Sequence, residues 1–269
     1  MSSESVAING VARPLPPSHL RLYLSPALAR SFGGPPAFET KYVLDPARAE
    51  RVEEWARRYL QFDPHADPAN GGVYRVHTLY FDTPGRDMFR RAPGHARHKF
   101  RVRRYGAEPV LFLERKTRVG DRVVKRRTRI EDTDLIRLAG GLADPTWSGH
   151  WFHRRLSVRG LRPACRVSYD RVAHIDAGAN GPLRLTLDRR VHCALADDFA
   201  IAELPIAKPA LNGEVIVELK YRTAMPALFK DLLVELGLAP RPTSKYRLGV
   251  AACNGSSAAG SGRRGEEAS

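Results

Sequence analysis

Several segments of this chain alternate between apolar and charged side chains, and this pattern limits the possible folds more than any other feature. In residues 98–105, Lys99, Arg101 and Arg103 alternate with Phe100 and Val102. Successive side chains of a β-strand point to opposite faces. The segment therefore predicts a strand with one basic face and one apolar face.

The same alternation recurs in residues 38–43, 110–117, 123–130, 183–189 and 215–221. The charged faces carry Glu39 and Lys41; Glu114 and Lys116; Lys125, Arg127 and Arg129; Arg184 and Asp188; and Glu218 and Lys220. Two further segments, 74–82 and 164–172, also have strand character, whereas helical patterns are few. About eight strands and few helices predict an α+β, mainly β chain: an eight-stranded antiparallel tunnel barrel with flanking helices.

The alternation alone also fits an ordinary sheet with one face in water. Two features favour the barrel. Arg and Lys recur in nearly every strand, and the carboxylates keep a fixed relation to lysines in Glu39-x-Lys41, Glu114-x-Lys116 and Glu218-x-Lys220. Cations buried without partners are costly, so a charged interior predicts interior carboxylates and a bound polyanion.

The formal net charge of +15 also indicates a polyanionic partner, without choosing among nucleic acid, anionic lipid and phosphate compounds. The chain has no helix-turn-helix pattern, no RRM signature and no aromatic residues interleaved with a basic run, so we expect no nucleic-acid partner. Arg suits phosphate because its planar guanidinium can donate two hydrogen bonds to phosphate oxygens.

Three segments carry helix signals. Asp45 and Pro46 are typical of an N-cap and a first helical residue. A second helix is predicted over 226–236, with its end at Gly237. Residues 244–248 predict a short helix or a last strand. Residues 37–253 should form one tunnel domain, with 1–36 flexible and 254–269 disordered because they have little to bury.

The remaining features bear on location and on cysteine chemistry. The chain lacks a signal-peptide pattern and an apolar run of about 20 residues, which predicts a cytoplasmic protein. Cys165, Cys193 and Cys253 lie far apart in the sequence without CxxC spacing, which supports neither a disulfide framework nor a zinc site. Tyr80 and Trp55 are interpreted as core residues.

Eight motifs follow one another in the order and spacing of a known family. They are FETKYVL, YRVHTLYFDT, KFRVRRYG, FLERKT, RVSYDR, LRLTLD, VIVELKY and SKYRLG. Over residues 37–250 the chain resembles the VTC domain, the polyphosphate polymerase domain of the vacuolar transporter chaperone complex and its bacterial relatives. That domain is a member of the triphosphate tunnel metalloenzymes, a CYTH-like superfamily with an eight-stranded antiparallel barrel.

The resemblance implies roles for individual residues. Phosphate-binding roles fall on Lys41, Arg101, Arg103, Lys116, Lys125, Arg166, Arg184, Lys220, Ser244 and Lys245. Within this set, the roles closest to catalysis fall on Arg101, Arg103, Lys116 and Lys245. Glu218 matches the carboxylate that holds a divalent metal, and Glu39 and Glu114 are further metal or structural carboxylates. Two positions depart from the family pattern: Ala37 stands where the first Glu of a Glu-x-Glu-x-Lys motif is common, and Pro242 replaces a lysine before the Ser-Lys motif.

The resemblance implies transfer of the ATP γ-phosphate to a growing inorganic polyphosphate chain, with Mn²⁺ or Mg²⁺ as cofactor. Phosphoryl transfer requires positioning and charge neutralisation rather than a protein nucleophile. Two alternatives remain open: hydrolysis of an inorganic or nucleoside triphosphate, and an inactive module that binds polyphosphate. The membrane helices and the SPX domain of the yeast complex are absent from the sequence, and it identifies no membrane-protein partner.

Overall fold

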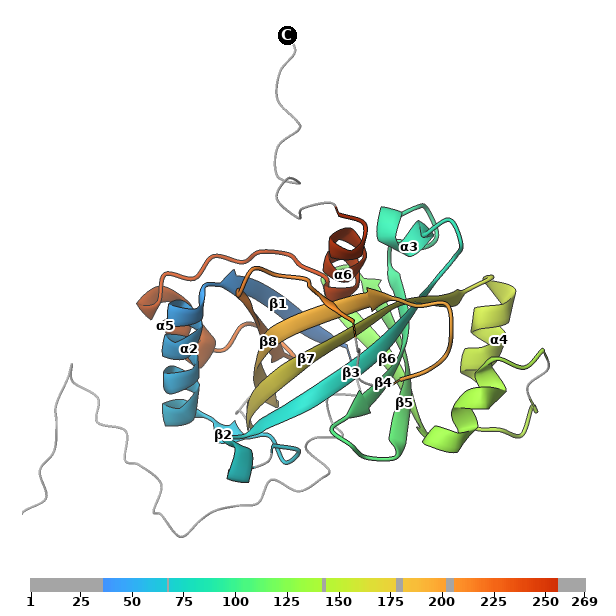
Figure 1. Ribbon diagram of the computed structural model, residues 1–269. Coiled ribbons are helices and arrows are strands. Elements are labelled where there is room, and N and C mark those ends of the chain that lie inside the picture. The colour runs from blue at the N-terminus through green and yellow to red at the C-terminus, as the bar shows by residue number, and fades with distance from the viewer. Residues whose placement is uncertain (1–35, 67, 142–143, 178–180, 202–205, 256–269) are drawn as a thin grey trace, which may run out of the picture.

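The computed structural model describes residues 36–66, 68–141, 144–177, 181–201 and 206–255 (Figure 1). The segments predicted to be flexible or disordered, 1–36 and 254–269, lie outside these ranges except for residues 36, 254 and 255. No helix in the described ranges is both long enough and apolar enough to cross a lipid bilayer.

Eight antiparallel strands in the described part of the chain form a closed barrel. They are β1 (Ala37–Leu44), β3 (Val73–Asp82), β4 (His98–Tyr105), β5 (Val110–Val119), β6 (Arg122–Glu131), β7 (Arg162–Asp176), β8 (Leu183–Leu195) and β10 (Val215–Tyr221). Their order is β7-β3-β4-β5-β6-β1-β10-β8, and β8 closes the ring by pairing with β7. The short strands β2 (Gln61–Phe62) and β9 (Lys208–Pro209) extend the sheet beside β7 and β8. This architecture confirms the predicted fold class.

The helices lie around the barrel and at one of its ends (Figure 1). They are α2 (Pro46–Tyr59), α3 (Asp87–Arg90), α4 (His150–Val158), α5 (Ala227–Glu235) and α6 (Lys245–Cys253), with 3₁₀ turns η1 (Pro68–Asn70) and η2 (Asp132–Leu138). As predicted, Asp45 caps α2: its side chain accepts a hydrogen bond of 2.9 Å from the Arg48 amide. Residues 244–248, which fitted either a helix or a strand, begin α6.

The barrel packs its apolar strand faces outward, against the helices. On one side, Leu185 and Leu187 of β8 and Val217 and Leu219 of β10 form a buried cluster with α2 and α5. On the other side, Phe152 of α4 packs against aromatic rings of β3 and β4. Because the apolar faces point outward, the charged faces of the same strands point into the barrel.

Helix α6 closes one end of the barrel by packing on the interior side of β7 and β8. Gly249 permits this close approach, because a Cβ there would lie 3.0 Å from Cys165 Sγ and 3.1 Å from Cys193 Cβ. The ring of Tyr246 packs at a tilt against the ring of Tyr80 of β3, with ring centroids 5.3 Å apart. Its hydroxyl donates a hydrogen bond of 2.5 Å to Asp82. These contacts place Lys245, the first residue of α6, at the inner cavity.

A β-bulge in β8 changes which side chains of this strand point inward. Ser168 and Asp170 of β7 pair with His192 and Arg189 of β8, so β8 has one extra residue at this point. Arg190 takes up the bend with a φ of 48°. Before the bulge, Asp188 points into the barrel; after it, Cys193 does.

Candidate active site

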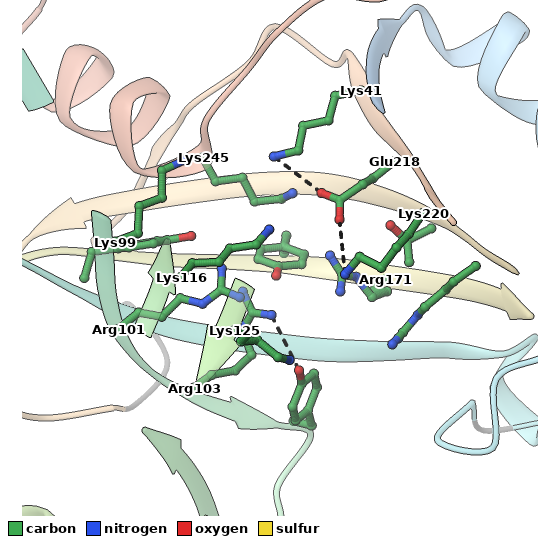
Figure 2. Close-up of a pocket in the computed structure, with 15 residues that line it drawn as sticks. Lys41, Lys99, Arg101, Arg103, Lys116, Lys125, Arg171, Glu218, Lys220 and Lys245 are labelled. Carbon is green, nitrogen blue, oxygen red and sulfur yellow. Dashed lines mark hydrogen bonds and ion pairs between the residues drawn. The ribbon is translucent and has the colours of Figure 1, made fainter. Parts of the chain in front are cut away.

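The interior of the barrel is a strongly basic cavity. Lys41, Tyr80, Lys99, Arg101, Arg103, Tyr105, Lys116, Lys125, Tyr169, Arg171, Arg184, Thr186, Glu218, Lys220 and Lys245 line it. The space between its atoms is about 760 Å³, part of which is continuous with solvent. Figure 2 shows that the labelled cations converge on this space from several strands and from the start of α6.

Strand alternation positions most of these cations. Lys99, Arg101 and Arg103 occupy alternate positions of β4 and point inward together, opposite Phe100 and Val102 in the outer core. In β1 and β10, Lys41 pairs in register with Glu218, and Glu39 with Lys220. The alternation with a period of two therefore places the charged side chains of separate strands in one cavity.

Glu114 is a fully enclosed carboxylate of the site, with none of its side chain exposed. Its oxygens lie 2.7 Å from Arg101 Nη2, 3.3 Å from Lys125 Nζ and 3.1 Å from Arg127 Nε. Although burial alone would raise it, the pKa of Glu114 is held well below its usual range by Lys125 and the neighbouring guanidinium groups. Glu114 is thus a permanently charged counter-ion for three cations.

Glu39 and Glu218 form a second group with lysines around them. Glu218 lies 3.4 Å from Lys41 Nζ, and Glu39 lies 3.1 Å from Lys220 Nζ and also contacts Lys116. Burial and the charge of Glu218 raise the pKa of Glu39, but Lys116 and the other lysines outweigh them and lower it to about 2. Burial would also raise the pKa of Glu218, but Lys41 and the other lysines hold it well below its usual range, so both carboxylates are ionised at neutral pH.

Asp188 of β8 joins Lys245 to Arg171. Arg171 holds it with two bonds, Nε to Oδ1 at 2.6 Å and Nη2 to Oδ2 at 2.7 Å. Lys245 Nζ lies 2.5 Å from Oδ2 of the same carboxylate. Asp188 is fully buried, so this ion pair fixes the position of Lys245 at the cavity wall.

Two cations of the cavity have no carboxylate within ion-pair distance in the described ranges. Lys99 Nζ donates to the Ser244 hydroxyl at 3.1 Å, and Arg103 Nε donates to the Thr78 hydroxyl at 3.2 Å. Burial and the nearby Lys41 and Lys116 charges lower the pKa of Lys99 well below its usual value. Positive charge therefore exceeds the negative charge that the protein supplies to the cavity.

The pKa values of two other cavity lysines are also lowered. Burial lowers the pKa of Lys116 to about 7 and that of Lys125 to about 8, although Glu39 and Glu114 partly offset the effect. A bound polyanion would favour the protonated forms of these lysines. The cavity is thus built to receive negative charge.

Most of the sequence-predicted site residues meet in this cavity. Lys41, Arg101, Arg103, Lys116, Lys125, Arg184, Lys220, Glu218 and Lys245 line it. Glu39 and Glu114 are not part of this lining, but they form ion pairs with lysines that are. Ser244 caps α6, with its hydroxyl 3.5 Å from the Arg247 amide, and lies in an adjoining groove that shares Lys41, Lys99 and Lys116 with the cavity. Pro242, where the family pattern has a lysine, lines the same groove.

The expected position of Arg166 is wrong. Its guanidinium points away from the cavity, where it contacts the Asp198 carboxylate and donates to the Ala200 carbonyl oxygen at 2.8 Å. Arg166 is on the opposite face of β7 from Tyr169 and Arg171, which line the cavity. The strand has charged residues on both faces, so alternation alone does not indicate which arginine points inward.

Sequence reasoning did not assign Lys99, Arg171 or Asp188 to the site. Lys99 shares the inward face of Arg101, and Asp188 that of Arg184, so the strand pattern contained a signal for both. Arg171 follows Tyr169 by two residues and replaces Arg166 as the inward arginine of β7. Only the closed barrel shows that this face points inward.

Three tyrosines also line the cavity. Tyr80 is one of them, so it belongs to the site as well as to the core in which the sequence placed it. The Tyr105 hydroxyl accepts a hydrogen bond of 3.0 Å from Arg127 Nη2. Burial would raise the pKa of Tyr105, but Arg127 and Arg103 lower it to about 6. The phenol oxygen of Tyr105 thus adds further negative potential to the basic wall.

The carboxylates fit a divalent cation only in part. No cluster of three or more metal-ligating side chains occurs within the described residues. Mg²⁺ commonly uses one or two carboxylates and completes its shell with water and substrate phosphates. Glu218 and Glu39 could supply such carboxylates. Glu114 does not fit the metal role suggested for it, because three cations already surround its oxygens.

One of the comparisons with known proteins identifies a family. The family model described as VTC domain matches residues 37–254. No curated protein sequence matches the chain. Among solved structures, a putative adenylate cyclase from Bacillus halodurans is similar, with 14% identity over 77% of this chain and 92% of that chain, at a TM-score of 0.48. The putative adenylyl cyclase HpAC1 from Hippeastrum, described as having a dominant triphosphatase activity, shares 16% identity over 82% of this chain and 97% of that chain, at the same TM-score.

Proposed function

The chain belongs to the VTC domain family, and from that premise we propose that it is a polyphosphate polymerase. It transfers the γ-phosphate of ATP to the end of a growing inorganic polyphosphate chain inside the barrel. One observation carries the proposal: the cavity is lined by ten cations, of which Lys99 and Arg103 lack a carboxylate partner in the described ranges. A linear chain of phosphates offers a line of negative charges that complements such a lining.

Different residues of the cavity have different roles in this transfer. Arg101 and Arg103 lie side by side on β4, where their guanidinium groups can steady the triphosphate and neutralise charge that develops on the transferred phosphoryl group. Lys116 and Lys245, held by Glu39 and Asp188, bind further phosphates. The terminal oxygen of the acceptor chain attacks the γ-phosphorus in line, the bond to the bridging oxygen breaks, and ADP leaves.

Glu218 and Glu39 would hold Mn²⁺ or Mg²⁺ together with phosphate oxygens. When bound, the cation supplies additional charge neutralisation at the phosphates. The chain's own contribution is then to orient the donor and the acceptor in a narrow space and to limit the access of water, which would compete as the acceptor. Transfer to water would make the same cavity a triphosphatase.

The test is to incubate the purified full-length chain with ATP and Mn²⁺ or Mg²⁺ and to separate the products on a polyacrylamide gel. The proposal predicts a ladder of long phosphate chains and stoichiometric ADP. Orthophosphate without a ladder would instead identify a triphosphatase. Tight binding of tripolyphosphate without turnover, with either metal ion, would identify an inactive binding module.

A pair of arginine variants shows whether the cavity does the chemistry. Arg103→Ala removes an inward guanidinium and should lower the rate roughly 100-fold, as the loss of one preorganised donor does in other enzymes. Arg166→Ala is the matched control, because it removes an outward guanidinium from the same barrel. It should leave the rate within about twofold. Equal losses in both variants would contradict the assignment of the cavity as the active site.

A further inference from the structure

The three cysteines of the chain, distant in sequence, meet at one place beside α6. Cys165 comes from β7, Cys193 from β8 after the bulge, and Cys253 is the last residue of α6. The Sγ atoms of Cys253 and Cys193 lie 3.6 Å apart. Gly249 packs against Cys165 and Cys193 one helical turn earlier, so the close approach of α6 brings the thiols together.

The thiols differ in accessibility and in their tendency to ionise. Cys165 and Cys193 are fully buried, whereas Cys253 is partly exposed at the end of α6. Interactions with the Cys165 and Cys193 thiols and with the Lys208 ammonium together outweigh burial and lower the pKa of Cys253 to about 6. Burial raises the pKa of Cys193 to about 12. Lys208 Nζ also donates to the Cys253 carbonyl oxygen at 3.4 Å, which keeps its charge near this sulfur.

We propose that Cys253 is an oxidation site whose sulfur is captured by Cys193 to form a disulfide between α6 and β8. A partly exposed cysteine whose sulfur lies 3.6 Å from a buried second thiol has the two features of a redox pair, a position near solvent and a resolving group within reach. The third thiol, Cys165, donates to the Arg166 carbonyl oxygen at 3.4 Å and stays reduced.

The oxidant is a peroxide. The Cys253 thiolate attacks one peroxide oxygen, the O–O bond breaks, and the leaving hydroxide or alkoxide takes a proton to give water or an alcohol. Cys253 is now a sulfenic acid. The Cys193 sulfur attacks the Cys253 sulfur, the S–O bond breaks, and the departing hydroxide takes the Cys193 proton and leaves as water. Two thiols are oxidised to one disulfide, and one peroxide is reduced.

The product would tie the last residue of α6 to β8, while the first residue of the same helix is the cavity lysine Lys245. Reaching the S–S bond length of about 2.05 Å from 3.6 Å requires a small movement of the two side chains or of the helix end. The site is independent of the phosphate chemistry in the cavity, so its test does not require activity.

The test uses the intact full-length chain, reduced first and then treated with hydrogen peroxide in slight excess. Intact-mass analysis should show a loss of two hydrogens, and peptide mapping without reduction should join the peptides of Cys193 and Cys253. The number of thiols that react with iodoacetamide in denaturant should fall from three to one. Dithiothreitol should restore all three.

Variants identify the partner. Cys165→Ala should still form the disulfide, whereas Cys193→Ala should stop at a sulfenic acid on Cys253, trapped by dimedone as a mass increase. Wild-type chain that keeps three thiols, or that oxidises only in denaturant, would overturn the proposal. A peptide map that joins Cys165 to Cys253 would overturn the assignment of Cys193. Because mapping of the wild-type chain needs no variant, a folding defect in one variant leaves the test decisive.

Discussion

Replacing Glu114 by Gln offers the sharpest test of how this basic interior is held together. The change keeps the size of the side chain and removes only the negative charge and one acceptor oxygen. Glu114 is fully buried and lies within 3.3 Å of Arg101 and Lys125 and within 3.1 Å of Arg127. The substitution therefore leaves three cations facing one another without their shared counter-ion.

The expected loss of stability follows from the burial of the pair. Removing one partner of a buried ion pair costs about 3–5 kcal/mol, because the remaining charge stays desolvated. For a folded unit of this size, 1 kcal/mol corresponds to a change of roughly 2–4 °C in melting temperature. Glu114→Gln should therefore melt about 10 °C below wild type, with part of the effect relieved by deprotonation of Lys125, whose pKa is already lowered to about 8.

The assay is thermal unfolding with and without tripolyphosphate. Glu131→Gln is the matched control, because Glu131 is exposed and pairs with Arg129 at 3.3 Å on the surface. A pair of that kind contributes about 0–1 kcal/mol, so its melting temperature should change little. Tripolyphosphate should raise the melting temperature of Glu114→Gln more than that of wild type. Equal melting temperatures of Glu114→Gln and Glu131→Gln would refute the reasoning.

Two further predictions concern α6 and the lysines. Gly249→Ala should lower the melting temperature, because the added Cβ would lie 3.0 Å from Cys165 Sγ. At an exposed helix position the same change stabilises by up to about 1 kcal/mol. A higher melting temperature would therefore contradict the packing of α6. Tripolyphosphate binding at pH 8 should take up protons, since the pKa values of Lys116 and Lys125, lowered to about 7 and about 8, rise beside phosphate. Titration calorimetry in buffers of different ionisation enthalpy measures this uptake, and its absence would exclude these lysines as the groups that respond.

The same pKa shifts also determine the direction in which the stability of the fold changes with pH. Lys116 has a folded pKa of about 7, below its usual 10.5, so the folded state binds fewer protons than the unfolded state between these values. Its unfavourable contribution is therefore full below pH 7 and is relieved as the pH rises toward 10.5. Glu39 has the opposite effect: with its pKa lowered to about 2, it stabilises the fold above pH 4.5, and this contribution is lost as the pH falls toward 2.

Local sequence determined the elements and much of the site. Alternation with a period of two is a property of each strand, so it placed Lys99, Arg101 and Arg103 on one face before any partner strand was known. The Asp45-Pro46 cap fixed the start of α2 through contacts within four residues of one another. The excess of positive charge also indicated a polyanionic ligand. Each of these inferences needs only near neighbours in the chain.

The tertiary structure decided the rest, because the deciding contacts join residues far apart in sequence. Both faces of β7 have charged residues, and only closure of the barrel places Arg171 inside and Arg166 outside. The extra residue of β8 at Arg190 reverses the alternation and turns Cys193 inward. The three thiols meet because α6 packs on that interior face. Alternation tells which side chains share a face, whereas the direction of that face depends on strand pairing around the whole ring.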